Sequence, residues 1–365
     1  MNIGIPKERR PFELRVGLSP AGVEILTQQG HHVYVEHEAG VGAGFDDREF
    51  ENAGGQVVYS PEEVFVRGDF LLKVARPTKG ELGWLRPGTA ILGLLHLASA
   101  REDKVEALLE KKITSIAYEQ IQTANGEHPV LRPFSEIGGK MAASVAARLL
   151  QNNWGGKGIL LGGIPGVPPA EVVIIGGGVV GLYATEAFIG LGAHVTVLDK
   201  SVHVLQEVYS RFSCVTTMIS TKRNLEKATA YADVVVGAVL VTGERTPVLI
   251  TREMMRGMKP RSVFIDVSID QGGCAETSRP TMHDQPTYVE EGILHYCVPN
   301  MPGVVARTAT HAFVNAAMPY IEDLANKGVA NAILDNEALS KAVNTHNGEL
   351  VHLSLLSNGG DDGLD

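Results

Sequence analysis

Short apolar runs alternate along most of the chain with stretches whose apolar residues recur at helical spacing. Helix starts are marked by Ser19-Pro20 and Ser60-Pro61, where serine can cap a helix and proline fits its first position; Gly30 marks a stop. Strands that alternate with helices predict an α/β fold with mostly parallel sheets and helices on their faces. In the first third of the chain, strands are expected at 3–5, 32–36, 56–59, 70–75, 90–95 and 115–118.

A second series of the same kind follows a polar segment at 121–134. A helix is expected from Ser135 to about Asn152, and a loop rich in Gly and Pro follows it at 155–170. Another helix is expected over 308–327 with a kink at Pro319, and the tail at 357–362 is expected to be disordered. The strands of this second series are expected near 171–175, 194–199, 216–220, 233–238, 262–269 and 293–298.

A glycine-rich turn between a predicted strand and a predicted helix carries the strongest chemical signal. Gly176, Gly178 and Gly181 form the pattern G-x-G-x-x-G, in which glycines permit a tight turn, close approach to a pyrophosphate and close helix–strand packing. Asp199 ends the next strand, where a carboxylate can hold the ribose hydroxyls and repel a 2′-phosphate, so NAD(H) is favoured over NADP(H), although Lys200 weakens this argument. The alternative is a purely structural turn. The predicted cofactor contacts in this segment are Gly176, Gly178, Val179, Val180, Gly181 and Asp199.

Composition narrows the class of protein. The 365 residues are enough for two domains, and 44% hydrophobic with 20% charged residues is ordinary for a folded soluble protein. A net charge of −10 without a dense basic run argues against nucleic acid or an anionic membrane as the main partner. No metal site is expected, because Cys214, Cys274 and Cys297 form no CxxC pair, and the spacing of His31, His32 and His37 fits a solvated strand better than a metal site.

The same features predict a location in the cytoplasm. Scattered cysteines, an odd number of them, suit a reducing compartment, and the first residues lack the long apolar region of a signal peptide. The most apolar stretch, 158–198, is interrupted by prolines and glutamates, which argues against a membrane span.

Ionisable residues stand where predicted strands end, and ligands of open α/β sheets bind beyond those ends. His96 follows one strand, and Asp270 follows another that also contains Asp266; by spacing alone the two aspartates are equally plausible. Lys73 lies inside an apolar run, where a lysine needs an anionic partner, and Arg15 lies in a short segment before Ser19. Each residue also has a purely structural interpretation, but together they suit a redox site for an α-amino or α-keto acid.

The motifs resemble those of alanine dehydrogenases over nearly the whole chain, and more distantly those of the NAD-binding subunit of proton-pumping transhydrogenases. Their order and spacing match throughout. The matching segments are 4–8, 13–16, 19–20, 95–98, 115–119, 162–167, 176–181, 237–241, 270–274 and 300–303.

The resemblance implies a substrate domain at 1–134, an NAD-binding domain at 135–304 and C-terminal helices at 305–365 that return to the substrate domain. It implies two Rossmann-like domains around a central cleft, a homo-oligomer that is commonly a hexamer, and an amino acid, a 2-oxo acid and ammonia as small-molecule partners. Carried over by position, Arg15 and Lys73 hold the substrate, His96 is the acid/base and Asp270 positions water. Further cofactor contacts implied in this way are Ser135, Ser220, Val239, Leu240, Asn300 and Met301.

Two departures from the family pattern bear on the substrate. Ala75-Arg76 replaces the usual Lys-Glu, and Gly93-Leu94 replaces an aromatic pair. Because the aromatic bulk is lost, we expect a substrate pocket with more room than the methyl group of alanine requires. We therefore expect 2-oxobutyrate or a longer 2-oxo acid to be reduced within about tenfold of the efficiency of pyruvate. The resemblance favours alanine as the substrate; a dehydrogenase for a larger amino acid, a transhydrogenase subunit and a non-catalytic NAD-binding protein remain alternatives.

Overall fold

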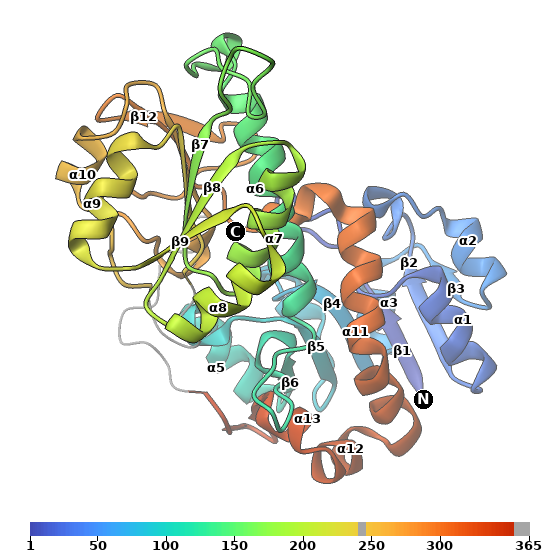
Figure 1. The fold of residues 1–365 in the computed structure, drawn as a ribbon. Coiled ribbons are helices and arrows are strands. Elements are labelled where there is room, and N and C mark those ends of the chain that lie inside the picture. Colours follow the sequence, from blue (N-terminus) through green and yellow to red (C-terminus); the bar gives the residue numbers. More distant parts are fainter. Residues whose placement is uncertain (240–245, 354–365) are drawn as a thin grey trace. The chain divides into compact units, whose positions relative to one another are not determined.

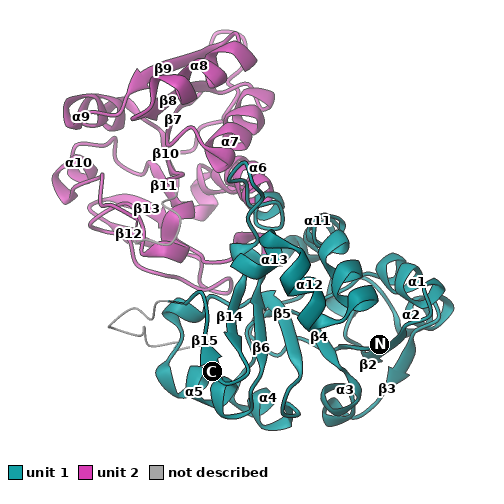
Figure 2. Cartoon of the chain, turned by 90° about the horizontal axis from the view of Figure 1, so that it is seen from below, with its two compact units in different colours: residues 1–134, 303–365 teal, residues 135–302 magenta. Residues whose placement is uncertain are grey.

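The chain divides into two compact units. The computed structural model describes residues 1–239 and 246–353. Unit 1 comprises Met1–Phe134 with Gly303–Asp365, and unit 2 comprises Ser135–Pro302 (Figure 2). Each unit contains one mostly parallel sheet with helices, which confirms the predicted α/β class. Leu240 and the tail at 357–362 lie outside the described residues.

The sheet of unit 1 has eight strands among the described residues, in the order β15-β14-β6-β5-β4-β1-β2-β3. The strands from β6 to β3 are parallel, whereas β14 pairs antiparallel with β6 and β15 antiparallel with β14. The sequence pattern did not predict β14 and β15, which extend the sheet from the C-terminal part of the chain. The strands are β1 (Asn2–Ile5), β2 (His32–Glu36), β3 (Gln56–Val58), β4 (Phe70–Ala75), β5 (Ala90–Leu94), β6 (Thr114–Ala117), β14 (Val343–His346) and β15 (Glu349–Leu350).

The helices of unit 1 begin largely where serine, threonine or proline signals them. Ser19 Oγ accepts a hydrogen bond from the amide of Gly22, and Pro20 begins α1. Helix α3 also begins at its proline, but the predicted cap at Ser60 is wrong, because its hydroxyl donates to Glu62 instead. The long helix α11, labelled in Figure 1, contains Pro319 and continues to Lys327. The helices are α1 (Pro20–Gln28), α2 (Asp47–Asn52), α3 (Pro61–Arg67), α4 (Lys79–Trp84), α5 (Glu102–Glu110), α11 (Ala306–Lys327), α12 (Val329–Asp335) and α13 (Glu337–Lys341).

The sheet of unit 2 has seven strands among the described residues, in the order β12-β13-β11-β10-β7-β8-β9, and only β12 is antiparallel to its neighbour. Side chains of β7 alternate between two buried clusters, with Val172 and Ile174 in one and Val173 and Ile175 in the other. Burial on both faces explains why this strand is a continuous apolar run. The strands are β7 (Glu171–Ile175), β8 (His194–Asp199), β9 (Val215–Ile219), β10 (Val234–Gly237), β11 (Val263–Asp266), β12 (Thr287–Glu290) and β13 (Ile293–Tyr296).

Two sequence predictions in this part of the chain need correction. Helix α6 begins at Arg132 rather than Ser135, because Pro133 fits the first turn of a helix. The strand expected over 262–269 ends at Asp266, whose carboxylate accepts the amide of Ser268 and starts a 3-10 turn, η5 (Val267–Gln271). The helices are α6 (Arg132–Leu149), α7 (Val179–Gly190), α8 (Val202–Arg211), α9 (Lys222–Tyr231) and α10 (Arg252–Arg256).

Candidate active site and cofactor-binding turn

The glycine-rich turn joins β7 to α7 in unit 2, and each of its three glycines has a distinct surrounding. Gly176 has φ +101°, and a Cβ there would lie 2.4 Å from the carbonyl oxygen of Ala238. A Cβ on Gly181 would lie 1.8 Å from the Gly176 oxygen, so only glycine allows the helix this close to the turn. A Cβ on Gly178 would meet nothing within 4 Å, which leaves the mouth of the turn open.

The start of α7 suits an anionic ligand. Gly178 occupies the N-cap position and offers no side chain to accept the first amides of a twelve-residue helix. Uncapped amides and the helix dipole together favour a phosphate. An open turn, close packing at Gly181 and an uncapped helix start fit the pyrophosphate of a dinucleotide.

Asp199 ties the end of β8 to the same turn. Its Oδ2 accepts the amide of Gly177 and its Oδ1 accepts the amide of Ser201, both at 2.8 Å. The carboxylate is half-buried, so it is oriented by the backbone and still open to a ligand. A fixed carboxylate in this place fits a ribose with two free hydroxyls and repels a phosphorylated one.

Replacing Asp199 is expected to weaken the preference for NAD⁺ over NADP⁺. Asp199→Asn keeps an oxygen for the Gly177 amide but removes the charge, whereas Asp199→Ala removes both. The ratio of kcat/KM for the two cofactors should fall in both variants, since repulsion of the 2′-phosphate is lost in both. Equal use of NADP⁺ by the wild-type protein would contradict the role given to this carboxylate.

The other predicted cofactor residues described in the structure also lie in unit 2. Ser220 follows β9, and its amide donates to the Asp199 carbonyl at 2.9 Å. Val239 follows β10 and donates its amide to Ser268 Oγ at 3.0 Å. Ser135 lies in the first turns of α6, Asn300 has a left-handed φ of 54°, and Met301 is buried in the core of unit 2.

The structure separates the two aspartates that spacing left equivalent. Asp266 is fully buried and accepts hydrogen bonds from the amides of Ser268 and Cys274 and from the hydroxyl of Ser278. Burial raises the pKa of Asp266, although the three hydrogen bonds to its carboxylate act to lower it. Asp270 is exposed, and its Oδ1 accepts the amide of Asn300 at 3.1 Å. Asp266 thus organises the turn, whereas Asp270 is open to solvent.

Arg15 lies in unit 1 and is 3% exposed. Its Nε donates to Glu13 Oε1 at 2.7 Å, its Nη2 donates to Oε2, and the guanidinium lies 4.9 Å above the ring of Phe134. Glu13 accepts two of the five N–H donors of the guanidinium, so this pairing does not use all of them. Glu13 and Phe134 fix the plane in which the remaining donors can meet a carboxylate.

Lys73 is completely buried in β4 and meets two carboxylates. Its Nζ lies 3.0 Å from Glu8 Oε2 and 2.8 Å from Glu81 Oε1. Glu8 also accepts the amide of Val74, and Glu81 belongs to the capping box that Thr78 forms at the start of α4. The expectation that Lys73 has an anionic partner is confirmed, since both Glu8 and Glu81 contact it.

The charges of this buried group are coupled. Burial alone would lower the pKa of the Lys73 ammonium, but attraction to Glu8 and Glu81 outweighs it and raises that pKa. Burial raises the pKa of Glu8 despite the attraction of Lys73, and nearby Glu13 adds to the rise. Burial works against Glu81 too, but Lys73 and Thr78 hold its pKa below the ordinary value. Lys73 therefore stays charged inside unit 1.

His96 follows β5 in a left-handed conformation, with φ 43° and ψ 43°. Its amide donates to Glu119 Oε1 at 2.6 Å, and the amide of Leu95 donates to Glu119 Oε2 at 3.2 Å. This backbone conformation costs a residue other than glycine about 1–2 kcal/mol, and a hydrogen bond to a charged group contributes roughly 1.5–3 kcal/mol. The side chain is 56% exposed, and its Nδ1 lies 3.7 Å from Glu119 Oε1.

Sequence reasoning missed the carboxylates that hold these residues. Glu8, Glu13 and Glu119 stand in the matching segments without a role assigned to them, and Glu81 was not singled out. An unpaired lysine in an apolar run was the one signal that an acid had to be near.

The backbone around Gly93 is closely packed. A Cβ at Gly93 would lie 3.2 Å from both Leu95 Cδ2 and the Lys73 carbonyl oxygen. The larger substrate pocket expected from Gly93-Leu94 stays a prediction, which the series of 2-oxo acids tests.

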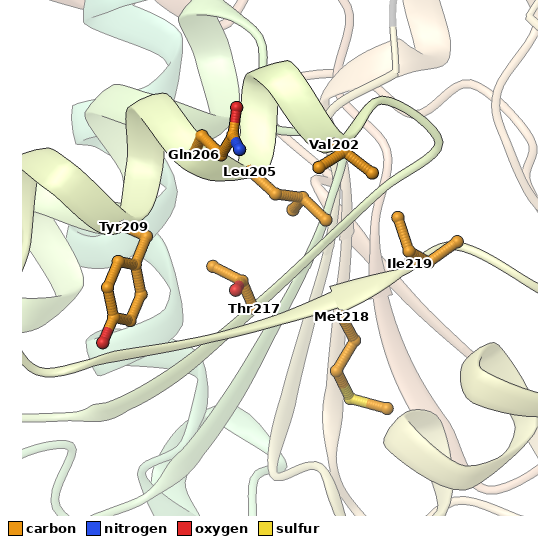
Figure 3. A pocket seen from close by; sticks show the side chains of 7 residues that line it. All are labelled: Val202, Leu205, Gln206, Tyr209, Thr217, Met218 and Ile219. Carbon is orange, nitrogen blue, oxygen red and sulfur yellow. The ribbon is translucent and has the colours of Figure 1, made fainter.

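A surface pocket in unit 2 lies between α8 and β9, as Figure 3 shows. Its lining is mostly hydrocarbon and includes none of the predicted site residues, so it offers no acid–base chemistry. The lining residues are Val202, Leu205, Gln206, Tyr209, Thr217, Met218 and Ile219.

Comparison with known proteins gives consistent matches. Residues 4–138 match the family described as Alanine dehydrogenase/PNT, N-terminal domain, and residues 142–353 match Alanine dehydrogenase/PNT, C-terminal domain. An alanine dehydrogenase of Methanococcus maripaludis is 46% identical over 354 residues, or 96% of this chain and 95% of that protein. An alanine dehydrogenase of Mycobacterium tuberculosis is 45% identical over 352 residues, with 96% and 95% covered.

Solved structures agree with these relatives. An L-alanine dehydrogenase superposes with a TM-score of 0.94 at 44% identity, covering 96% of this chain and 97% of that one. A transhydrogenase from Sinorhizobium meliloti superposes with a TM-score of 0.83 at 26% identity, covering 96% and 99%. These matches confirm the resemblance read from the motifs, and the chain belongs to the alanine dehydrogenase/PNT family.

Proposed function

We propose that this protein is an NAD-dependent alanine dehydrogenase, which converts L-alanine, NAD⁺ and water to pyruvate, ammonium, NADH and a proton, and catalyses the reverse reaction. The observation that carries the proposal is the set of oriented groups in unit 1. Two buried cations, Arg15 and Lys73, are fixed by carboxylates, and His96 is held at the end of β5. Full-length relatives named alanine dehydrogenase support the choice of substrate.

Each residue has a role that follows from its chemistry. Arg15 binds the substrate carboxylate, and Lys73 binds the carbonyl oxygen, where negative charge develops as ammonia adds to the carbonyl carbon. Bound NAD⁺ supplies the acceptor for the hydride that leaves the substrate α-carbon. His96 takes a proton from the water that attacks the iminium carbon, and Asp270 orients that water. Gly176, Gly178, Gly181 and Asp199 would hold the cofactor.

We further propose a homo-oligomer in the cytoplasm. The loop before β7 exposes three apolar side chains, Leu160, Ile164 and Val167, each more than half exposed, and contact with another subunit would bury this apolar surface. All three cysteines are free thiols, which suits a reducing compartment. Among the described residues no helix is both long and apolar enough to cross a membrane.

The direct test is oxidation of NADH in the presence of ammonia and a series of 2-oxo acids: glyoxylate, pyruvate, 2-oxobutyrate and 2-oxovalerate. Pyruvate is expected to have the highest kcat/KM. With the larger pocket expected from Gly93-Leu94, 2-oxobutyrate should stay within about tenfold of pyruvate, whereas in a pocket fitted to a methyl group each added methylene would cost roughly 1–3 kcal/mol, or about 10–200-fold. Initial rates from the absorbance of NADH give the comparison.

The outcomes separate the proposal from its alternatives. Reduction of 2-oxobutyrate or 2-oxovalerate faster than pyruvate would point to a larger amino acid as the substrate. Binding of NADH without oxidation by any of the four acids would point to a cofactor-binding protein that is not a dehydrogenase. Reactions without ammonia are the control, since reductive amination requires it.

A further inference from the structure

We propose that Arg76 is a positioning residue for His96, and that its guanidinium fixes the turn from which the imidazole projects. The inference rests on the proposed function, because it takes His96 as the group that moves the proton. Arg76 directly follows β4 and His96 lies just beyond β5. These strands are parallel neighbours with Ala75 opposite Leu94, so both residues leave the sheet at the same edge.

The contact joins the side chain of Arg76 to the backbone of His96. Arg76 Nη1 donates to the His96 carbonyl oxygen at 3.0 Å. Ser99 Oγ donates to the same oxygen, also at 3.0 Å. The guanidinium brings a full positive charge to this carbonyl, which makes its hydrogen bond the stronger of the two.

Glu119 holds the opposite side of the residue. Its carboxylate accepts the amides of Leu95 and His96, so an anion binds the peptide group before the Cα of His96 and a cation binds the peptide group after it. The left-handed backbone is unfavourable for histidine, and both restraints favour this conformation of the turn. With both peptide groups fixed, only the side-chain torsions remain to direct the imidazole.

The backbone of Arg76 is held as well. The residue is half-buried, and its carbonyl oxygen accepts a hydrogen bond from Arg10 Nε at 3.2 Å. Alanine dehydrogenases usually have a glutamate at this position, and a glutamate carries no proton to donate to a carbonyl at neutral pH. The contact with His96 therefore depends on Arg76, the residue at which this chain differs from the usual family pattern.

The test compares Arg76→Met and Arg76→Lys with the wild-type protein in steady-state pyruvate reduction. Methionine keeps apolar bulk but has no donor, so kcat is expected to fall by about tenfold or more, since small displacements of a reacting group are costly. The KM for NADH should stay within about twofold, and the melting temperature should change little. Lysine offers a charged donor again and should recover kcat to within about threefold of wild type.

Arg101→Met is the matched control, because Arg101 lies in the following loop and pairs with Asp103 in an exposed contact. Its kcat should equal that of wild type. If Arg76→Met does not fold, Arg76→Leu, which also lacks a donor, takes its place under the same criteria.

Three results would overturn the inference. One is a kcat for the methionine variant within threefold of wild type; another is a folded lysine variant with no recovery. The third is a raised KM for pyruvate at unchanged kcat, which would make Arg76 a substrate-binding group. An inactive wild-type protein would instead contradict the proposed function, so the two failures are distinguishable.

Discussion

Replacing His96 with alanine is expected to lower kcat for pyruvate reduction by a factor of roughly 10²–10⁴, the usual contribution of a general acid–base group. The affinity for NADH should change little, because the proposed cofactor contacts all lie in unit 2 and His96 lies in unit 1. Steady-state rates at saturating pyruvate and ammonia give kcat, and fluorescence titration gives the dissociation constant of NADH.

A second variant separates the imidazole from the backbone that carries it. Asparagine tolerates the left-handed region better than alanine does, so His96→Asn should keep the turn at φ 43° while removing the acid–base group. We expect the asparagine variant to lose as much activity as the alanine variant. A kcat within threefold of wild type for His96→Asn would exclude His96 as the acid–base group.

Replacing Lys73 with methionine is expected to destabilise the protein by roughly 3–5 kcal/mol, the usual result of removing one partner from a buried ion pair. Glu8 and Glu81 would be left buried without the cation that both contact within 3.0 Å. Urea and thermal unfolding of the purified variant measure the loss, independently of any effect on substrate binding.

An exposed pair of the same length provides the control. Lys7 Nζ lies 3.0 Å from Glu38 Oε2, but both side chains are about half exposed. Lys7→Met should therefore change the unfolding midpoint very little. Adding Glu8→Gln and Glu81→Gln to Lys73→Met removes both stranded charges and should recover much of the loss. A Lys73→Met variant as stable as Lys7→Met would show that this buried cluster contributes little to the fold.

Local patterns predicted the parts of the fold that depend on neighbours in sequence. The βαβ unit from Glu171 to Asp199 is one example, because an apolar strand, a turn that only glycine can adopt at Gly176 and a helix are each specified within a few residues. The start of α1 at Ser19-Pro20 is another, since capping is a contact within one turn.

Other features depend on contacts between distant residues, and local patterns carry little of that information. The strand β14 (Val343–His346) has no strong signal of its own and forms because β6 offers it a free edge. The strand expected up to residue 269 ends at Asp266 because the side chain of that aspartate captures the amide of Ser268.

The sequence by itself determined the fold class and the dinucleotide-binding turn, because glycine patterns are local signals. Its polar residues at strand ends and within apolar runs made Arg15, Lys73, His96, Asp266 and Asp270 candidates, and the resemblance to a family preferred Asp270 to Asp266. Only the tertiary structure decided which carboxylates hold them. Glu8 lies far from Lys73 in the chain, and Glu119 follows β6 whereas His96 follows β5. Parallel strands bring such residues together at one sheet edge, and a buried charge is stable only when that pairing is made.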